Sequence, residues 1–287
     1  MNHYDIAILG GDRRIAYMAP MFAAEGCRVT CYGTCDFPES SSSAPPAIAS
    51  SLKEALDTTG TIVCGIPFEK SGFLYCEDRV HIPIPELQRC LRKGQSLFAG
   101  MLPEDFRHHC EERSIKCHDF MKDEPLTLFN AIATAEGAIL EALSHKETLL
   151  HGSKCLVLGF GRCGSLIAER LKGLNADVTI TAQRAAAMAL AGTKGFTAFP
   201  LTDLTSEISK FDFIFNTIPA CYLGEESLPK VRRDCLIIDI ASARTGVDYK
   251  KAEELSLNCL FCPGLPGKYA AESCAQRMVK YVLNNLP

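Results

Sequence analysis

Short apolar runs alternate with stretches of helical periodicity along almost the whole chain. In the first half, the pattern predicts strands at residues 5–10, 28–33, 61–67, 95–100 and 115–120. In the second half, it predicts strands at residues 154–159, 177–182, 196–200, 212–217, 235–240 and 258–262. Strands that alternate with helices build a parallel sheet covered on both faces, so the fold class is α/β. We expect two Rossmann-like, doubly wound parallel-sheet domains with a cleft between them.

A long helix that begins at Asp123 is predicted to join the two halves. Asp123 can cap it, Pro125 is tolerated in its first turn, and an apolar stripe follows. The stripe consists of Leu128, Phe129, Ile132, Ala135, Ile139 and Leu143. We therefore place an N-terminal substrate domain at residues 1–128 and a cofactor-binding domain at 129–267. The closing segment, 268–287, reads as a helix that can pack back on the first domain.

Composition narrows the classes of partner. The 287 residues are 47% hydrophobic and 22% charged, and the net charge is -4. Lys and Arg are scattered, which argues against a nucleic-acid surface and against binding to an anionic membrane. The start carries Asp5 inside its first apolar run, and no near-continuous apolar stretch of ~20 residues is visible. We expect a cytoplasmic protein that binds a small molecule, and a homo-oligomer is compatible with the sequence.

Three further features of the sequence are not expected to take part in catalysis or metal binding. The Ser- and Pro-rich stretch 38–51 reads as a surface loop. Fifteen cysteines form an odd set in a chain without an export signal, so we expect reduced thiols. Cys259-x-x-Cys262 lacks a second such pair, and the adjacent His108 and His109 lack ligand spacing, so no metal site is predicted.

A glycine motif predicts the cofactor site. Gly159-x-Gly161-x-x-Gly164 follows a predicted strand directly and opens a helix. Gly159 permits a tight turn, Gly161 lets the backbone approach a pyrophosphate, and Gly164 allows close packing of helix and strand. The helix N-terminus, with the backbone of Arg162 and Cys163, would attract the anion.

The next strand ends without the acidic residue that usually binds the ribose of NAD. An acid there would accept hydrogen bonds from the 2'-hydroxyl and would repel a 2'-phosphate. This strand instead ends with Thr181, Ala182, Gln183 and Arg184. Since Arg184 offers a planar cation suited to phosphate, NADP is the predicted cofactor.

Two later strand ends complete the predicted cofactor site. In α/β sheets, ligands bind at the carboxyl ends of the strands. Asn216, Thr217 and Pro219 are expected to flank the nicotinamide ribose, and Ala241 and Ser242 to lie near the ring.

Taken together, these motifs resemble the A subunit of dipicolinate synthase, a family found in spore-forming bacteria. The resemblance covers nearly the full length and rests on the order and spacing of six segments. They are GGDRR (10–14), AEGAI (135–139), HGSKCLVLGFGRCG (151–164), NTIP (216–219), IIDIAS (237–242) and PGLPG (263–267).

The resemblance implies oxidation of dihydrodipicolinate, formed from 4-hydroxy-tetrahydrodipicolinate, to dipicolinate with NADP during sporulation. It also implies a flavoprotein-like second subunit as partner and the cytoplasm of the mother cell as location. A dicarboxylate substrate needs cationic donors. The candidates are Arg13, Arg14, Arg244 and Lys268, with Asp12 as a further contact or a helix cap. GGDRR lacks the third glycine of a dinucleotide turn, so we interpret it as a pocket rim.

Other functions stay open at this stage. No His follows His151, which argues against a lactate-type dehydrogenase with a histidine acid and base. An NADP oxidoreductase like shikimate dehydrogenase, with another substrate, is one alternative. A non-catalytic protein that binds NADP and regulates a partner is another. The sequence does not identify the proton acceptor.

Overall fold

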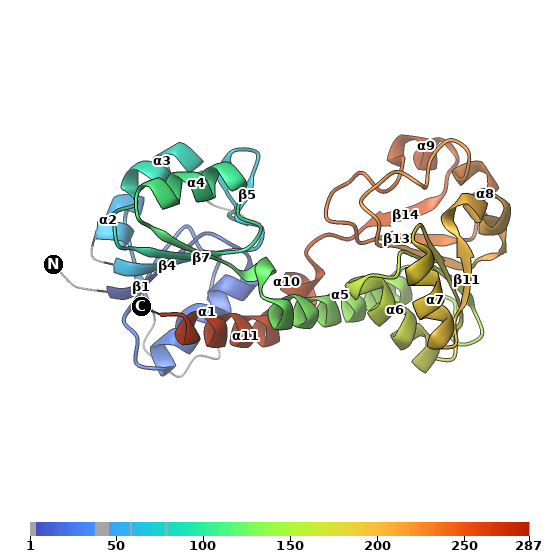
Figure 1. Ribbon diagram of the computed structural model, residues 1–287, viewed down its shortest axis with the longest axis horizontal. Helices are drawn as coiled ribbons and strands as arrows, with labels where there is room; N and C mark the ends of the chain where they lie inside the picture. The colour runs from blue at the N-terminus through green and yellow to red at the C-terminus, as the bar shows by residue number, and fades with distance from the viewer. Residues whose placement is uncertain (1–3, 38–45, 58, 78–79, 287) are drawn as a thin grey trace. The chain divides into compact units, whose positions relative to one another are not determined.

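The computed structural model describes residues 4–37, 46–57, 59–77 and 80–286 (Figure 1). The chain divides into two compact units. Unit 1 comprises residues 1–129 and 270–287, and unit 2 comprises residues 130–269. The boundaries predicted from the sequence were after residues 128 and 267.

Unit 1 is built on a parallel sheet with the strand order β3-β2-β1-β4-β7-β8. Its strands are β1 (Tyr4–Leu9), β2 (Val29–Tyr32), β3 (Ala47–Ile48), β4 (Thr59–Cys64), β7 (Ser96–Ala99) and β8 (Lys116–Asp119). Five of the six were predicted. The exception is β3, a two-residue edge strand inside the segment interpreted as a loop; residues 38–45 of that segment lie outside the described residues.

Helices cover both faces of this sheet, as Figure 1 shows. One face carries α2 (Leu52–Asp57), α3 (Ile84–Cys90) and α4 (Glu104–Glu112). The other carries α1 (Arg13–Ala24) and α11 (Ala271–Asn284), whose apolar sides share one core. The C-terminal helix thus returns to unit 1, where its buried Met278 and Val282 pack.

Unit 2 repeats this plan with the order β11-β10-β9-β12-β13-β14. Its strands, all parallel, are β9 (Lys154–Leu158), β10 (Asp177–Ala182), β11 (Thr197–Pro200), β12 (Phe213–Asn216), β13 (Leu236–Asp239) and β14 (Asn258–Phe261). One face packs against α5 (Glu124–His145), α6 (Arg162–Gly173), α7 (Ala185–Thr193) and α10 (Leu265–Tyr269). The other packs against α8 (Leu204–Glu207), α9 (Tyr249–Glu254) and the short 3₁₀ turns η2 (Leu201–Asp203), η3 (Ile208–Lys210) and η4 (Leu228–Lys230). Two doubly wound sheets confirm the predicted fold class.

Helix α5 runs through the division between the units. Asp123 accepts a hydrogen bond from the backbone of Leu126 at 2.8 Å, as a cap does. The predicted apolar stripe is only partly correct, because Leu128 and Leu143 are 43% and 50% exposed. Within unit 2 the buried positions are instead mainly alanines, with Ile139. By length and hydropathy α5 would pass for a membrane span, yet half of its most apolar window is buried.

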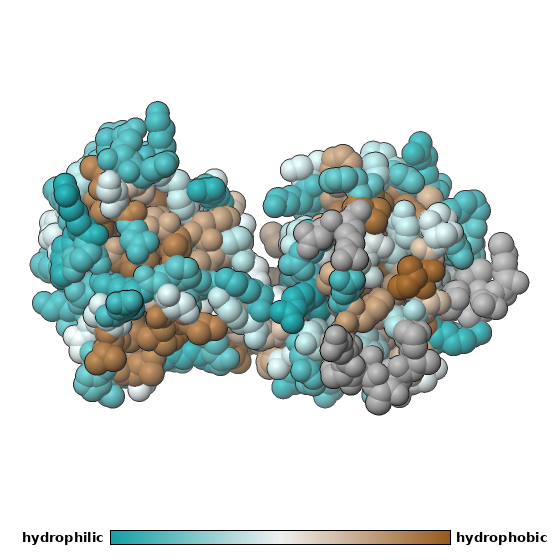
Figure 2. All heavy atoms as spheres, turned by 180° about the vertical axis from the view of Figure 1, so that it is seen from behind, coloured by the Kyte–Doolittle hydropathy of each residue, from teal (hydrophilic) through white to brown (hydrophobic). Residues whose placement is uncertain are grey.

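Several large apolar side chains of unit 2 are exposed. They are Leu140, Leu143, Leu149, Leu174 and Leu190. Figure 2 shows hydrophobic surface among polar side chains on this unit.

Two local features were not predicted. A hairpin of β5 (Glu69–Lys70) and β6 (Phe73–Leu74) extends from unit 1. In unit 2, Gly173 remains helical, and Asn175 takes the left-handed conformation, with φ 59°, that ends α6. The amide of Ala176 then bonds to the carbonyl of Leu171 at 3.0 Å, which completes a Schellman-type end.

Candidate cofactor and substrate site

The strand register of unit 2 brings four predicted segments to one edge of the sheet. Leu158 pairs with Thr181 on one side and with Asn216 on the other, and Asn216 pairs with Asp239. These residues end or nearly end their strands. The glycine turn and the loops after β10, β12 and β13 therefore all begin at the carboxyl edge, where α/β folds bind ligands.

The glycine motif has the geometry that its spacing predicts. Gly159 has a φ of 92°, and a Cβ on it would lie 2.5 Å from Oγ1 of Thr217. A Cβ on Gly164 would lie 2.1 Å from the carbonyl oxygen of Gly159. By contrast, a Cβ on Gly161 would meet nothing within 4 Å. The turn is thus tightly packed against the protein and open at Gly161, where a ligand would approach.

The N-terminus of α6 faces this opening. Gly161 is its N-cap residue, and no side chain caps the helix. Arg162 is exposed and Cys163 is half-buried. Burial raises the pKa of the Cys163 thiol, so this residue offers its backbone and not a thiolate. Backbone N–H groups and the helix dipole favour an anion at this end.

The end of β10 carries a buried hydroxyl and an exposed cation. Thr181 is fully buried, and its hydroxyl has no hydrogen-bond partner among the described residues. A buried donor left unsatisfied costs about 1–3 kcal/mol. Arg184 is exposed at the N-cap of α7, and its side chain makes no hydrogen bond or ion pair with other described residues. The exposed Arg184 side chain is open to a polar ligand, whereas the Thr181 hydroxyl, which was predicted to contact the cofactor, is enclosed by protein.

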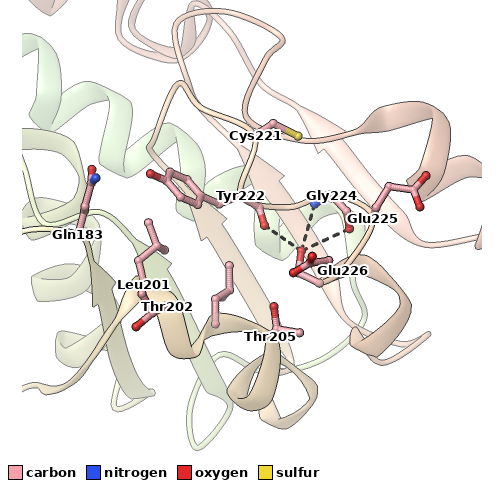
Figure 3. A pocket seen from close by; sticks show the side chains of 11 residues that line it. Gln183, Leu201, Thr202, Thr205, Cys221, Tyr222, Gly224, Glu225 and Glu226 are labelled. Atoms are coloured by element: carbon pink, nitrogen blue, oxygen red, sulfur yellow. Dashed lines mark hydrogen bonds between the residues drawn. The ribbon is translucent and has the colours of Figure 1, made fainter.

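A pocket of about 420 Å³ lies beside this strand end (Figure 3). It is lined from the segments after β10, β11 and β12, and its walls include Gln183, Leu201 and Tyr222. Figure 3 shows the carboxylates of Glu225 and Glu226 at the end away from Gln183. Its place between three strand ends makes it a candidate for the adenosine half of a dinucleotide.

The loop after β12 differs from the prediction in one respect. Asn216 was expected to contact the nicotinamide ribose, but it is fully buried and its amide is used internally. Its Nδ2 donates to the carbonyl of Ile218 at 3.1 Å and to Asp239 at 2.9 Å, and its Oδ1 accepts from the amide of Ile218. The Thr217 hydroxyl donates to the carbonyl of Leu158 at 2.8 Å. Asn216 and Thr217 therefore shape the loop, and of the three predicted residues Pro219 is exposed.

A residue that sequence reasoning missed ends β13, just before the loop that follows this strand. Asp239 is fully buried and accepts hydrogen bonds from Asn216, from the amide of Ala241 at 3.1 Å, and from the Tyr249 hydroxyl at 2.5 Å. Ser242 is exposed on this loop. The signal was present, since Asp239 is an acid at the end of an otherwise apolar run.

Arg244 projects from the same loop. It is exposed, and its guanidinium lies over the Tyr249 ring, 4.3 Å from the ring centre. No hydrogen bond or ion pair engages it in the described part of the chain. Its N–H donors are therefore available to a carboxylate.

Arg14 requires a correction. It was expected at an open pocket rim, but it is 3% exposed. Its Nη2 lies 2.7 Å from Asp12 Oδ2 and 2.6 Å from the carbonyl of Ile66. Asp12 also caps α1 through the amide of Arg14 at 3.0 Å. The pair is structural, whereas Arg13 is exposed and carries no such partner among the described residues.

The first glycine turn of unit 1 is covered by protein. Gly11 donates to the carbonyl of Tyr75 at 2.6 Å. A Cβ on Gly10 would lie 2.6 Å from the same oxygen. The segment after the β5–β6 hairpin thus occupies the place that a pyrophosphate would need.

Lys268 is also paired within the protein. Its Nζ lies 2.6 Å from Oε1 of Glu141, a residue of α5 that is 3% exposed, and the Tyr269 hydroxyl donates to the same oxygen at 2.8 Å. Burial alone would raise the pKa of Glu141, but the bonds from Lys268 and Tyr269 lower it. Lys268 is therefore less available to a substrate than Arg244.

Neither sulfur nor metal chemistry is indicated by the described residues. Their cysteines are all free thiols. Burial raises the pKa of Cys259 and Cys262, to about 12 and about 11. No cluster of three His, Cys, Asp or Glu that could hold a metal occurs in this part of the chain.

Comparison with known proteins assigns each unit. Residues 5–121 match the family model of the N-terminal domain of the dipicolinate synthase A subunit. Residues 131–249 match the NAD binding domain of D-isomer specific 2-hydroxyacid dehydrogenases.

Individual relatives agree with these matches. The dipicolinate synthase A subunit of Bacillus subtilis (strain 168) is 31% identical over 180 residues, which span 63% of this chain and 61% of that protein. The crystal structure of the dipicolinate synthase A chain from Bacillus subtilis matches with a TM-score of 0.81 at 24% identity, over 100% of this chain and 96% of that one. The corresponding A subunit from Bacillus halodurans matches with a TM-score of 0.83 at 21% identity, over 98% and 97% of the two chains.

The two structural matches establish the fold, and the family models and the sequence relative show which proteins each part of the chain is similar to. The chain therefore resembles dipicolinate synthase A subunits, and its unit 2 is an NAD(P)-binding Rossmann domain.

Proposed function

We propose that this chain oxidises dihydrodipicolinate to dipicolinate with NADP, as the A subunit of a dipicolinate synthase. The observation that carries the proposal is the carboxyl edge of unit 2. This edge has an open glycine turn, a helix N-terminus without a side-chain cap and a pocket of about 420 Å³. It also carries Arg244, whose N–H donors are free among the described residues.

NADP supplies a hydride acceptor when bound, and the ring of the substrate loses one hydride and one proton to become aromatic. The chain's residues then have mainly to orient two rings. Correct orientation alone can contribute roughly 7–11 kcal/mol to lowering a barrier. A reaction of this kind agrees with the carboxyl edge of unit 2, which offers hydrogen-bond donors for anions and no evident acid and base pair among the described residues.

The preference for NADP rests on the end of β10. An acid that would repel a 2'-phosphate is missing there, and Arg184 is exposed and unpaired among the described residues. Glu225 and Glu226 lie at the opposite end of the adenosine pocket from Gln183 (Figure 3), so their charges stand away from the proposed phosphate position. Phosphate binding by Arg184 would therefore not compete with these carboxylates.

Substrate binding is assigned to Arg244. Among the five candidates, Arg14 and Asp12 use their charges on each other, and Lys268 is bound to Glu141. Arg13 is exposed in unit 1, and in the sequence it is far from the cofactor-binding loops of unit 2. Arg244 lies on the loop after β13, at the same edge as the cofactor site, and keeps its donors free. It is suited to bind one carboxylate of a dicarboxylate substrate.

We also propose a flavoprotein-like second subunit as partner and the cytoplasm as location. If turnover requires that partner, this chain would be the nucleotide-binding half of a shared enzyme. The alternative of a purely regulatory NADP-binding protein predicts no turnover under any condition.

The test uses the purified full chain with and without the second subunit, supplied with enzymatically made 4-hydroxy-tetrahydrodipicolinate and either NADP or NAD. We expect dipicolinate, followed by mass, to form with NADP. Replacement Arg184→Ala should weaken NADPH binding by tenfold or more, because charge-assisted hydrogen bonds contribute about 1.5–3 kcal/mol. NADH binding should change little. Arg162→Ala is the control, since it keeps the backbone N–H that faces the pyrophosphate, and any effect of its lost charge should be equal for both cofactors. Equal losses from Arg184→Ala would refute the phosphate assignment.

Cofactor occupancy can be measured without turnover. Cys221 is exposed and lines the adenosine pocket. NADPH should slow alkylation of Cys221 and leave that of Cys90, on α3 of unit 1, unchanged. Alkylation of Cys221 at the same rate with saturating NADPH would show that the pocket does not hold the cofactor.

A further inference from the structure

The end of β13 is the centre of a hydrogen-bond network with no assigned role in the proposed reaction. At its centre is Asp239, which is fully buried. Its Oδ1 accepts from Asn216 Nδ2 at 2.9 Å and from the amide of Ala241 at 3.1 Å, and its Oδ2 accepts from the Tyr249 hydroxyl at 2.5 Å. We call these four residues the Asp239 network.

Tyr249 connects this network to the free cation. It begins α9, its ring meets the ring of Phe261 edge to face at 6.1 Å, and the Arg244 guanidinium lies 4.3 Å from its centre. Burial and the bond to Asp239 raise the pKa of the Tyr249 hydroxyl, which therefore remains a hydrogen-bond donor at neutral pH. The ring is fixed at one end by hydrogen bonding and at its edge by packing.

Stacking restrains an arginine without using its donors. A guanidinium that lies over a ring is attracted through its face, and its N–H groups remain in the plane and point away. A free arginine side chain samples many rotamers, and a ligand must otherwise restrict them on binding. The Arg244 guanidinium lies over the Tyr249 ring at 4.3 Å, with no competing hydrogen bond or ion pair among the described residues.

The Asp239 network is closely packed against the backbone at Gly246. A Cβ on Gly246 would lie 2.2 Å from Asn216 Nδ2 and 3.2 Å from Oδ1 of Asp239. The Thr245 hydroxyl donates to the carbonyl of Pro219 at 3.2 Å, which ties the loops after β12 and β13 together. One buried carboxylate thus holds both loops.

We propose that Tyr249 is a positioning residue: Asp239 fixes its phenol, and its ring fixes the Arg244 guanidinium so that its donors face a carboxylate of the substrate. This inference rests on the proposed function, since Arg244 is the substrate contact there. It adds that affinity for the dicarboxylate depends on a tyrosine that the substrate does not touch.

The test compares Tyr249→Leu and Tyr249→Phe in the full chain, with the second subunit where turnover requires it. Tyr249→Leu removes the ring and should raise KM for dihydrodipicolinate by about two- to fivefold, in the range expected for a lost cation–π contact at an exposed arginine. Tyr249→Phe keeps the ring and should recover most of that loss. The Kd for NADPH should stay within twofold in both variants. Tyr222→Leu is the contrast, because it lines the adenosine pocket and should raise KM for NADP instead.

A second measurement separates this inference from the proposed function. Phenylglyoxal modifies accessible guanidinium groups, and the rate at Arg244 can be followed by peptide mass without any substrate. Tyr249→Leu should change this rate at least threefold, and Tyr249→Phe should not. If the wild-type chain neither turns over nor binds pyridine-2,6-dicarboxylate, the proposed function fails while this result can still support the positioning of Arg244. Wild-type KM and an unchanged modification rate in Tyr249→Leu would overturn the inference.

Discussion

A Cβ atom on Gly164 would lie 2.1 Å from the carbonyl oxygen of Gly159, so helix α6 meets the end of β9 at a distance that only glycine permits. At Gly161, in the middle of the same motif, a Cβ would meet nothing within 4 Å. The motif thus contains one glycine required by the protein and one that leaves space for a ligand.

This difference separates the effects of two alanine substitutions. Gly164→Ala should destabilise unit 2 by about 1–3 kcal/mol or more, because the methyl group forces the helix from the strand. Gly161→Ala should change stability by less than about 0.5 kcal/mol, since its φ of -90° suits alanine. It should nevertheless weaken NADPH binding at least tenfold. Thermal unfolding and calorimetric titration of both variants measure these effects. Unchanged NADPH affinity in Gly161→Ala would contradict the placement of the pyrophosphate.

The Asp12–Arg14 pair should act on stability and not on catalysis. Asp12→Ala leaves a buried guanidinium without its carboxylate, and such losses typically cost about 3–5 kcal/mol. The neighbouring Arg13→Ala is the control, because Arg13 is exposed and should change stability by less than about 0.5 kcal/mol. Thermal unfolding of the two variants provides the measurement. If Arg14→Met folds with wild-type stability and raises only KM for the substrate, Arg14 is a substrate contact after all.

The Glu141–Lys268 pair predicts a dependence of stability on pH. Bonds from Lys268 and Tyr269 lower the pKa of Glu141 despite its burial. A lowered pKa means that the stabilisation is complete above the ordinary value, near 4.5, and is lost as pH falls through the lowered one. Glu141→Gln should cost about 1–2 kcal/mol at pH 7, and the difference from wild type should shrink towards pH 3.

Unfolding curves measured between pH 3 and pH 8 check this expectation. Glu136→Gln is the control on the same helix, because Glu136 is 63% exposed and its ion pair with Arg170 should contribute little. A constant difference between wild type and Glu141→Gln across this range would show that the charge of Glu141 does not stabilise the fold.

Much of the fold could be predicted from local pattern. In the two six-stranded parallel sheets, eleven of the twelve strands lie within a few residues of predicted apolar runs, because parallel strands buried on both faces leave a continuous signal. The missed strand, β3, has two residues at a sheet edge, and so short a pairing leaves no periodicity to read. The stripe of α5 was misjudged at Leu128 and Leu143, since alanines such as Ala135 and Ala138 permit closer helix packing than leucines do.

The α/β class, the glycine turn and the lack of an acid after β10 could all be read from neighbouring residues, because backbone freedom and strand burial are local properties. Only the tertiary structure shows which charged side chains have no partner within the protein. Arg14, Lys268 and Arg244 look alike in a sequence, yet Asp12 and Glu141 bind the first two, while Tyr249 holds the third by its face. Pairing of charges depends on contacts between residues that can be far apart in the chain, and Glu141 lies 127 positions from Lys268.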